Sequence, residues 1–274
     1  MRIAVWNLPP ADLIASGFSS GARRDQFEVR RLRIPDCERA LLDGAADVAL
    51  LPTLSVLEHH EVVDVIPAVA LSTWKYPFAR LVMENGLGSD VRVVAYNPDF
   101  EQERRLCEIV LREHYRMEPE FMACVDASTE DLLRADADAR LLVGPDVPAI
   151  STDGRALDIG QEWFELAAYP MTWGLFAARK DELDPPAIRS VRDAVLASER
   201  QKQSWHRAQG TSEPLHAFYA DELRFRLDDL CVAGLTEFRQ YLFYHDVSDD
   251  IRVIPFVFLP DEDGEPDEPT GPIL

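Results

Sequence analysis

The sequence predicts an α/β protein that is folded as two lobes and ends in a helical C-terminal region. Its first half alternates strand-like and helix-like stretches, at residues 2–6, 11–16, 27–34, 36–42 and 48–51. Such alternation is typical of an α/β fold with a largely parallel sheet. A second alternating set opens at residues 91–96, and the chain from residue 186 onward reads almost entirely as helix. We expect these last helices to pack on the first lobe.

The second set of elements centres on a helix predicted over residues 100–115. Its apolar residues recur at spacings of three and four, which is the period of one buried helical face; they are Phe100, Leu106, Ile109, Val110 and Tyr115. Asp99 is placed to cap this helix, and as an alternative its carboxylate could act as a base or bind a cation. A strand at 121–125, a helix from residue 129 and a strand at 140–143 complete the set.

Residues 157–179 join a short amphipathic helix to an apolar strand. Trp163, Leu166 and Ala167 give the helix one buried face, and Pro170 ends it because proline has no N–H to donate. Residues 173–178 then read as a buried strand. We interpret this strand and the one at residues 79–83 as two crossover strands between the lobes. The predicted division is 1–84 and 171–258 for a discontinuous lobe 1 with the C-terminal helices, and 85–170 for lobe 2.

The end of the chain is predicted as three helices and an acidic tail. The helices cover residues 187–208, 214–230 and 235–244, with breaks at Gly210 and Gly234, and a possible homodimer would pair two subunits through them. Residues 259–274 hold six acidic residues with Pro and Gly. Such a segment buries too little apolar surface to order itself, so we expect it to be mobile.

Four blocks of this chain occur in the same order in a known family. They are residues 46–56 (ADVALLPTLSV), 106–115 (LCEIVLREHY) with 118–121, 141–147 (LLVGPDV), and the helix–Pro–strand segment that ends in Ala-x-Arg at residue 179. On these blocks the chain resembles the menaquinone-biosynthesis proteins of the futalosine pathway, which include chorismate dehydratase and a sibling acting on a cyclic futalosine derivative. The resemblance covers most of residues 1–180. It implies a two-lobed, type II periplasmic-binding-protein-like fold with a ligand cleft between the lobes.

The resemblance also implies where a ligand would bind. In this fold, turns between strands and helices grip carboxylates with the backbone N–H groups of helix N-termini. Residues 71–80 match the family's segment that leads into the first crossover, at the mouth of the cleft. The implied hydrogen bonds to a leaving hydroxyl come from catalytic residues Asn7, Ser72 and Thr73. The candidate substrate-binding residues in and beside these segments are Thr53, Ser55, Tyr76, Arg80, Asn97, Gly144 and Trp173.

Two of these residues also have an ordinary structural interpretation. Thr53 follows a buried strand, where its hydroxyl could cap the next helix as well as contact a ligand. Arg80 is a cation in an otherwise apolar strand and therefore needs a carboxylate. A diacid ligand would match its planar fork, and an internal Asp or Glu would do so too.

The chain departs from the family at positions that face the ligand. Residues 6–12 read WNLPPAD where members that dehydrate chorismate have Ser-Tyr-Leu-Asn-x-x-Pro, residues 96–100 read YNPDF in place of a Ser/Thr-rich turn, and Arg80 replaces a Ser. These changes suggest a different ligand. The function expected from the resemblance is elimination of water from chorismate. The alternatives are a non-catalytic small-carboxylate-binding protein or sensor, and the step on the larger futalosine derivative.

Composition and charge limit the kinds of partner that the protein is expected to bind. A net charge of −21 argues against nucleic acid, whose backbone such a surface repels. No segment is long and apolar enough for a membrane span, and the first residues lack the apolar stretch of a secretory signal, which predicts a cytoplasmic protein. The expected partner is thus a small-molecule carboxylate, chorismate or similar, with no nucleic acid and no membrane.

No sequence motif indicates a metal or another cofactor. The six histidines lack the spacing of metal ligands, and Cys37, Cys107, Cys124 and Cys231 are too scattered for a zinc or redox site. The sequence also contains no Gly-rich phosphate loop. We therefore predict chemistry that needs no metal and no cofactor.

Overall fold

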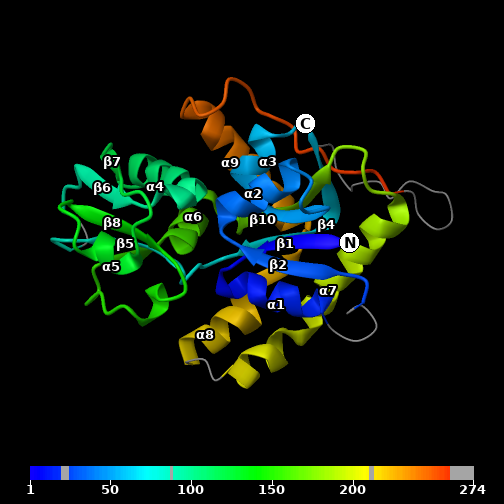
Figure 1. Cartoon of the computed structure of the whole chain (residues 1–274). Helices are drawn as coiled ribbons and strands as arrows, with labels where there is room; N and C mark the ends of the chain where they lie inside the picture. The colour runs from blue at the N-terminus through cyan, green and yellow to red at the C-terminus, as the bar shows by residue number, and fades with distance from the viewer. Residues whose placement is uncertain (20–24, 87–88, 210–212, 260–274) are drawn as a thin grey trace.

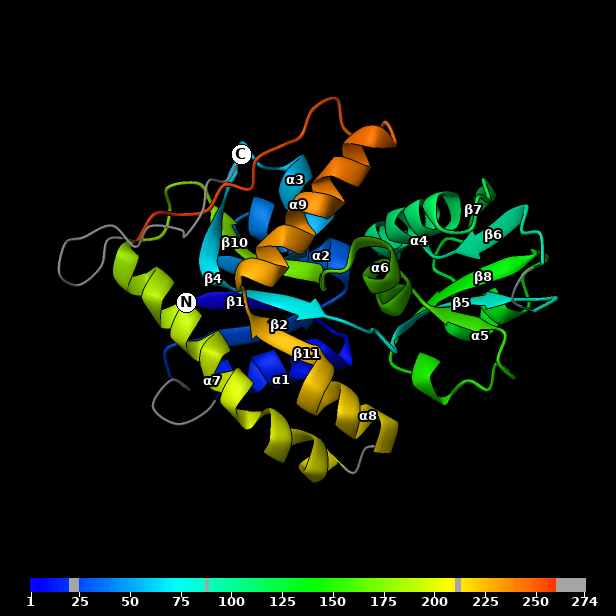
Figure 2. The same ribbon diagram turned by 180° about the vertical axis from the view of Figure 1, so that it is seen from behind.

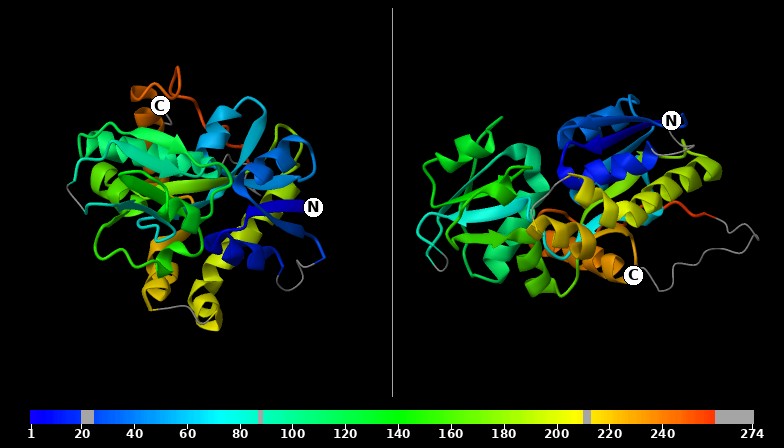
Figure 3. Two further views of the ribbon diagram at one scale, coloured as in Figure 1. Left: turned by 60° about the vertical axis from the view of Figure 1, so that its left-hand side comes forward. Right: turned by 90° about the horizontal axis from the view of Figure 1, so that it is seen from below.

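The structure, a computed structural model, describes residues 1–19, 25–86, 89–209 and 213–259. It consists of two lobes, each built on one β-sheet (Figure 1). The six-stranded sheet of lobe 1 has the order β11-β4-β10-β3-β1-β2, and the five-stranded sheet of lobe 2 has the order β7-β6-β8-β5-β9. Figure 3 shows the two lobes side by side from two further directions. The predicted α/β, two-lobed fold class is confirmed.

The sheet of lobe 1 takes strands from both ends of the chain. They are β1 (Arg2–Trp6), β2 (Glu28–Leu32), β3 (Val48–Pro52), β4 (Val63–Thr73), β10 (Met171–Arg179) and β11 (Leu223–Arg226). β1 is parallel to β2 and β3, whereas β10 is antiparallel to β3 and β4, and β11 is antiparallel to β4. The sheet is therefore mixed and not largely parallel, because the chain returns from lobe 2 to insert β10 at its centre.

The sheet of lobe 2 repeats this design on a smaller scale. Its strands are β5 (Ala79–Met83), β6 (Val93–Tyr96), β7 (Glu120–Ala123), β8 (Ala139–Val143) and β9 (Ala156–Asp158). β6 is parallel to β7 and β8, and β5 is antiparallel to β8 and β9. The helices of this lobe are α4 (Glu101–Glu113), α5 (Thr129–Leu133) and α6 (Ile159–Ala167).

Helices cover both faces of the lobe 1 sheet. In Figure 1, α2 (Ile34–Leu42), α3 (Thr53–Glu58) and α9 (Asp229–Tyr244) lie above the sheet, and α1 (Pro9–Phe18), α7 (Pro185–Gln209) and α8 (Glu213–Ala217) lie below it. The C-terminal helices α7 and α9 contact β4 and β10, as expected for a region that packs on lobe 1. Within the described part of the chain, no helix combines the length and the apolar character that crossing a bilayer requires.

The chain passes between the two sheets twice. The first crossing, residues 74–78, leads from β4 to β5, and the second, residues 168–170, leads from α6 back to β10 (Figure 2). The assignment of residues 79–83 to lobe 1 is wrong, because β5 pairs with β8 and β9 in the lobe 2 sheet. The first boundary therefore lies before β5 and not at residue 84.

The predicted helix over residues 214–230 is also wrong. After α8 the chain forms a π-helical turn, Phe218–Glu222, and then the edge strand β11. Leu223 and Phe225 are buried while Arg224 and Arg226 point outward, which is the alternation of a strand and not of a helix. The predicted acidic tail lies outside the described residues, except for Leu259.

Gly234 allows α9 to touch the second crossing. A Cβ at this position would lie 2.3 Å from the carbonyl oxygen of Pro170. Helix propensity alone would make Gly234→Ala stabilising by about 1 kcal/mol. We expect a net loss of about 1–3 kcal/mol instead, because α9 or the crossing must shift to admit the methyl group. Chemical denaturation checks this against Thr236→Ala, which removes a hydroxyl bonded within α9. A gain in stability for Gly234→Ala would contradict the packing described here.

Candidate active site

The two lobes meet along a closed seam between the first residues of β10 and the first turn of α4. Gln102 of α4 spans this seam. Its Nε2 donates to the carbonyl of Trp173 at 2.7 Å, and its Oε1 accepts from the N–H of Leu54 at 3.0 Å. Gln102 is only 3% exposed. One amide of lobe 2 therefore holds both β10 and the start of α3 in lobe 1.

An ion pair closes one edge of the seam. Arg33, at the start of α2, donates to the carboxylate of Asp99 at 3.2 Å and lies 3.7 Å from Asp126. The prediction that Asp99 caps α4 is wrong, because that helix has no side-chain cap and Asn97 caps the short turn before it. The pair is half exposed, so we assign it a small contribution to stability.

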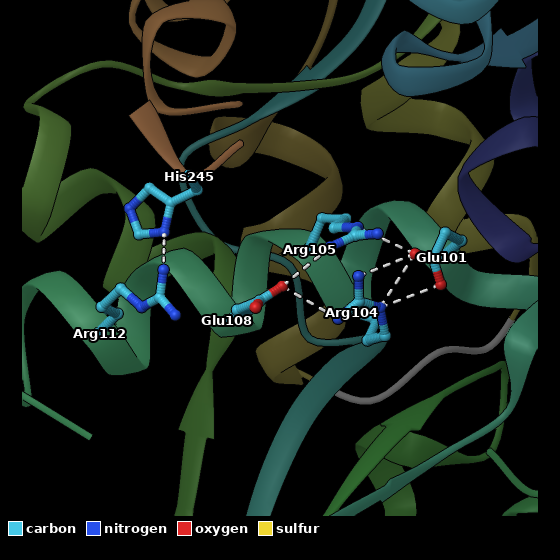
Figure 4. Close-up of polar contacts among 6 residues, drawn as sticks. All are labelled: Glu101, Arg104, Arg105, Glu108, Arg112 and His245. Atoms are coloured by element: carbon cyan, nitrogen blue, oxygen red, sulfur yellow. Dashed lines mark hydrogen bonds and ion pairs between the residues drawn. The ribbon is translucent and has the colours of Figure 1, made fainter. Parts of the chain in front are cut away.

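A buried histidine closes the opposite edge. His245 follows α9 of lobe 1 and lies 3.2 Å from Arg112 of α4 (Figure 4). Its other ring nitrogen lies 3.0 Å from Glu113. Because arginine can only donate, both contacts form together when Nδ1 of His245 accepts from Arg112 and Nε2 donates to the carboxylate.

Four predicted site residues gather on the lobe 1 side of the seam. Thr53 Oγ1 donates to the carbonyl of Thr172 at 2.7 Å, and Ser72 Oγ lies 2.9 Å from Thr172 Oγ1. Trp173 Nε1 donates to Thr73 Oγ1 at 2.7 Å. All of these residues are buried, so they form an internal network and not the expected open mouth of a cleft. Thr53 does not cap α3, since its hydroxyl bonds to β10.

Two aromatic side chains beside this network carry polar atoms without partners. Tyr76, in the first crossing, stacks on Trp173 with ring centroids 4.3 Å apart. Its hydroxyl and the Nε1 of Trp6 have no hydrogen-bond partner among the described residues. Trp6 comes this close because Gly174 has no side chain: a Cβ there would lie 2.7 Å from the indole. Since buried polar groups nearly always have partners, these two atoms are candidates for contact with a bound molecule.

Glu103, which sequence reasoning missed, is a buried carboxyl group near Tyr76. It lies in the first turn of α4, is 2% exposed, and makes no ion pair with any described residue. Burial raises its pKa to about 7. Burial also raises the pKa of Tyr76 well above its usual value, and the nearby Glu103 charge raises it further. The seam thus holds a carboxyl group that is about half ionised at neutral pH.

The neighbours of Glu103 do not neutralise it. Figure 4 shows that Arg104, the next residue, is bonded to Glu101 and Glu108. A sequence signal for Glu103 did exist. It lies three residues before Leu106, on the apolar stripe of the helix, where a carboxylate is out of place.

The structure does not bring the predicted turn residues to the seam network. Ser55 donates to Glu38 of α2 at 2.5 Å, and the amide of Asn97 donates to the carbonyl of Ala127 at 2.9 Å. The N–H of Gly144 donates to Phe78 at 3.0 Å, so it is not available to a ligand. Asn7 is exposed at the end of β1, and only its backbone N–H has a partner among the described residues.

The guanidinium of Arg80 forms no ion pair in the described part of the chain. Arg80 lies opposite Asp158 of β9. Asp158 instead accepts from the N–H groups of Tyr76 and Gln161, at 2.8 and 3.0 Å. Burial raises the pKa of Asp158, and the hydrogen bonds from Tyr76 and Gln161 and then the charge of Arg80 lower it in part. The carboxylate of Asp158 thus bonds to backbone N–H groups and forms no ion pair with Arg80.

One group of potential metal ligands appears that the sequence spacing did not show. Ligand atoms of His114, Glu162 and Glu165 all lie within 4.8 Å of one another. Glu162 already accepts from the hydroxyl of Tyr115 at 2.7 Å. Burial raises the pKa of Glu162 and this hydrogen bond lowers it. These contacts give the group a structural role at the junction of α4 and α6.

Gln102→Met tests whether the seam holds the lobes together. The variant leaves the N–H of Leu54 and the carbonyl of Trp173 without partners, and each buried unpaired group costs about 1–3 kcal/mol. We expect a loss of that order in the free energy of unfolding, measured by urea denaturation. The matched control is Gln161→Met on α6, whose amide bonds only to Glu165. Equal effects of the two substitutions would contradict this role of Gln102.

Solved structures with this architecture include several binding proteins. The alkanesulfonate-binding protein SsuA from Xanthomonas axonopodis pv. citri, bound to MOPS, superimposes with a TM-score of 0.68 at 11% identity, over 94% of this chain and 97% of that one. The periplasmic aliphatic sulphonate binding protein SsuA from Escherichia coli gives 0.66 at 15% identity, over 93% and 90%. Protein AF1704 from Archaeoglobus fulgidus gives 0.64 at 16% identity, over 90% and 98%. At these identities the likeness shows the type II periplasmic-binding-protein fold alone.

The sequence identifies a family for this chain, which the likeness in fold alone does not. The family described as menaquinone biosynthesis matches residues 1–244, which include both lobes and the last described helix. This match covers the seam and every residue of the network around Trp173. The chain therefore belongs to the menaquinone-biosynthesis family.

Proposed function

We propose that this protein is a lyase that eliminates water from chorismate to give 3-enolpyruvyl benzoate. Membership of the menaquinone-biosynthesis family supports a role in that pathway. The observation that carries the proposal is the buried carboxyl group of Glu103, whose pKa of about 7 suits a general base at neutral pH. It lies at the junction of the lobes, where ligands bind in proteins of this fold.

The proposed reaction needs one proton acceptor and help for a leaving group. The carboxylate of Glu103 takes a ring proton, the electron pair of that C–H bond forms a ring double bond, and the C–O bond to the ring hydroxyl breaks. The proton that Glu103 gains then neutralises the hydroxide, which leaves as water. The product ring is aromatic, so the site mainly has to orient the substrate.

Groups around Glu103 can supply this orientation. The hydroxyl of Tyr76, which has no partner among the described residues, can donate to the leaving hydroxyl. The hydroxyl of Thr73 accepts from Trp173, so its own O–H can still donate a hydrogen bond. Asn7 and Arg80 are the other predicted residues whose side chains have no partner among the described residues. We assign Arg80 to a substrate carboxylate, which its planar fork matches.

Substrate entry requires the lobes to separate. The seam is closed by Gln102 and by the pair of Arg33 with Asp99. Hinge motion at residues 74–78 and 168–170 would break these contacts and expose the seam, as in other two-lobed proteins. Reclosure would then exclude water from the reacting atoms.

Incubating the purified protein with chorismate tests the proposal. We expect loss of the diene absorbance and a product that is lighter by one water molecule. Tight binding of chorismate or another acid without turnover would instead establish the second candidate, a non-catalytic carboxylate-binding protein or sensor. That alternative is favoured by the internal hydrogen bonds that already occupy Thr53 and Ser72. Turnover of the futalosine derivative alone would identify the sibling reaction.

A further inference from the structure

A second polar site lies in lobe 1, behind the seam. It is a cavity of about 20 Å³ between α3, α9 and the residues that follow α9. Its walls are mainly leucine and valine side chains, with two guanidinium groups, Arg239 and Arg252, and one carboxyl group, Glu58. Among the residues that line the cavity, the two arginines outnumber the one acid.

Arg239 has no ion-pair partner in the described part of the chain. It is 6% exposed, and among the described residues its Nε has no hydrogen-bond partner. The one hydrogen bond that it makes to a described residue is long, 3.4 Å from Nη2 to the carbonyl of Ile251. Burial lowers its pKa, yet a guanidinium stays protonated in proteins. A buried charge without compensation is strongly unfavourable, so this one needs an anion.

The other charged groups of the cavity do not supply that anion. Arg252 adds positive charge and lies 3.6 Å from the exposed Asp250. Its Nη1 donates to the carbonyl of Leu57 at 3.3 Å. Glu58 forms no ion pair with a described residue, and its pKa is raised by burial and by the charge of Glu38. Among the described residues, the one carboxyl group in the cavity wall therefore forms no ion pair with Arg239.

We propose that this cavity binds a small inorganic anion of the size of chloride, held by Arg239 and assisted by Arg252. The volume exceeds the roughly 10–15 Å³ that one water molecule needs and excludes an organic acid such as chorismate. A chain of net charge −21 repels anions in general, so binding requires a local concentration of cations such as this one. The site is linked to the seam through Leu54, whose side chain lines the cavity and whose N–H bonds to Gln102.

Chloride itself is the probe for the test. We expect the ³⁵Cl NMR line of sodium chloride to broaden with the wild-type protein, and several-fold less with Arg239→Gln. Chloride should also raise the wild-type unfolding midpoint more than gluconate does at equal ionic strength, since gluconate is too large for the cavity. Arg200→Gln, on the exposed face of α7, should behave as wild type.

Arg252→Gln keeps the test decisive if Arg239→Gln does not fold. It should weaken the chloride response without abolishing it. Equal line broadening for the wild type and both cavity variants, or equal stabilisation by chloride and gluconate, would overturn the proposal. None of these measurements depends on chorismate, so their outcome is independent of the proposed lyase activity.

Discussion

Replacing Glu103 by Gln is expected to lower the turnover of chorismate by about 10²–10⁴-fold, the usual contribution of a general base. The substitution preserves the size and shape of the side chain and removes only its ability to accept the ring proton. Glu103 is buried and makes no ion pair with any described residue, so the substitution breaks no ion pair there. The effect should therefore appear in kcat, with little change in the affinity for chorismate.

The matched control lies on the same helix. Glu108→Gln changes a carboxylate that pairs with Arg104 and Arg105 on the other side of α4. It should leave turnover within a few-fold of wild type. If both variants retained full turnover, Glu103 would not be the base, and the proton acceptor would have to be sought elsewhere in the seam.

The same substitution is expected to stabilise the protein at neutral and alkaline pH. The pKa of Glu103 is about 7 in the folded protein, against 4.5 for an ordinary glutamate. The folded state therefore binds this proton more tightly than the unfolded state does. Its contribution to stability is complete below about pH 4.5 and is lost as the pH rises to about 7. At about 1.4 kcal/mol for each pKa unit, the loss amounts to about 3 kcal/mol.

Glutamine does not ionise and so does not suffer this loss. The difference in free energy of unfolding between Glu103→Gln and the wild type should grow between about pH 4.5 and 7 and stay constant above. Urea denaturation at a series of pH values measures it, and contributions from all other groups cancel in the difference. A difference that does not change with pH would mean that Glu103 is solvated. A variant that is inactive and more stable is the behaviour expected when a site holds an unpaired charge for catalysis.

Local patterns in the sequence were sufficient to predict most elements of the two lobes. The alternation in residues 2–51 and the helix stop at Pro170 reappear as β1 to β3 and as the junction of α6 with β10. Strand pairing could not be predicted in the same way. Residues 79–83 have the buried alternation of any strand, and only the register with β8 and β9 shows that they belong to lobe 2. β11 has only four residues, too few for a periodic signal.

The candidate site was only partly predictable for a related reason. Ser72, Thr73, Tyr76 and Trp173 were predicted because they adjoin the crossings, and the structure places them close together, while their role in binding stays a prediction. Glu103 was missed because it lies in a run of charged and polar residues, EQERR, in which a carboxylate is expected to be exposed to solvent. Its burial arises only when lobe 1 covers the first turn of α4. The position of Glu103 on the apolar stripe of α4 is a local signal of burial, but the contact with lobe 1 that causes the burial has no local signal.

The functional assignment of Arg80 and the possible homodimer stay predictions. Arg80→Ala should weaken chorismate binding, observed as a rise in KM of at least several-fold, while leaving the fold intact because Arg80 has no ion pair to lose among the described residues. Unchanged KM and kcat would remove it from the anchoring role.

The pH dependence of kcat/KM for chorismate tests the central claim most directly, because it reports the ionisation of groups in the free enzyme that turnover requires. A buried carboxyl that must be ionised predicts a rate that climbs as pH increases and levels off above about pH 7, in line with the raised pKa of Glu103. A profile that is already level from pH 5 upward would contradict the assignment of this carboxyl as the base.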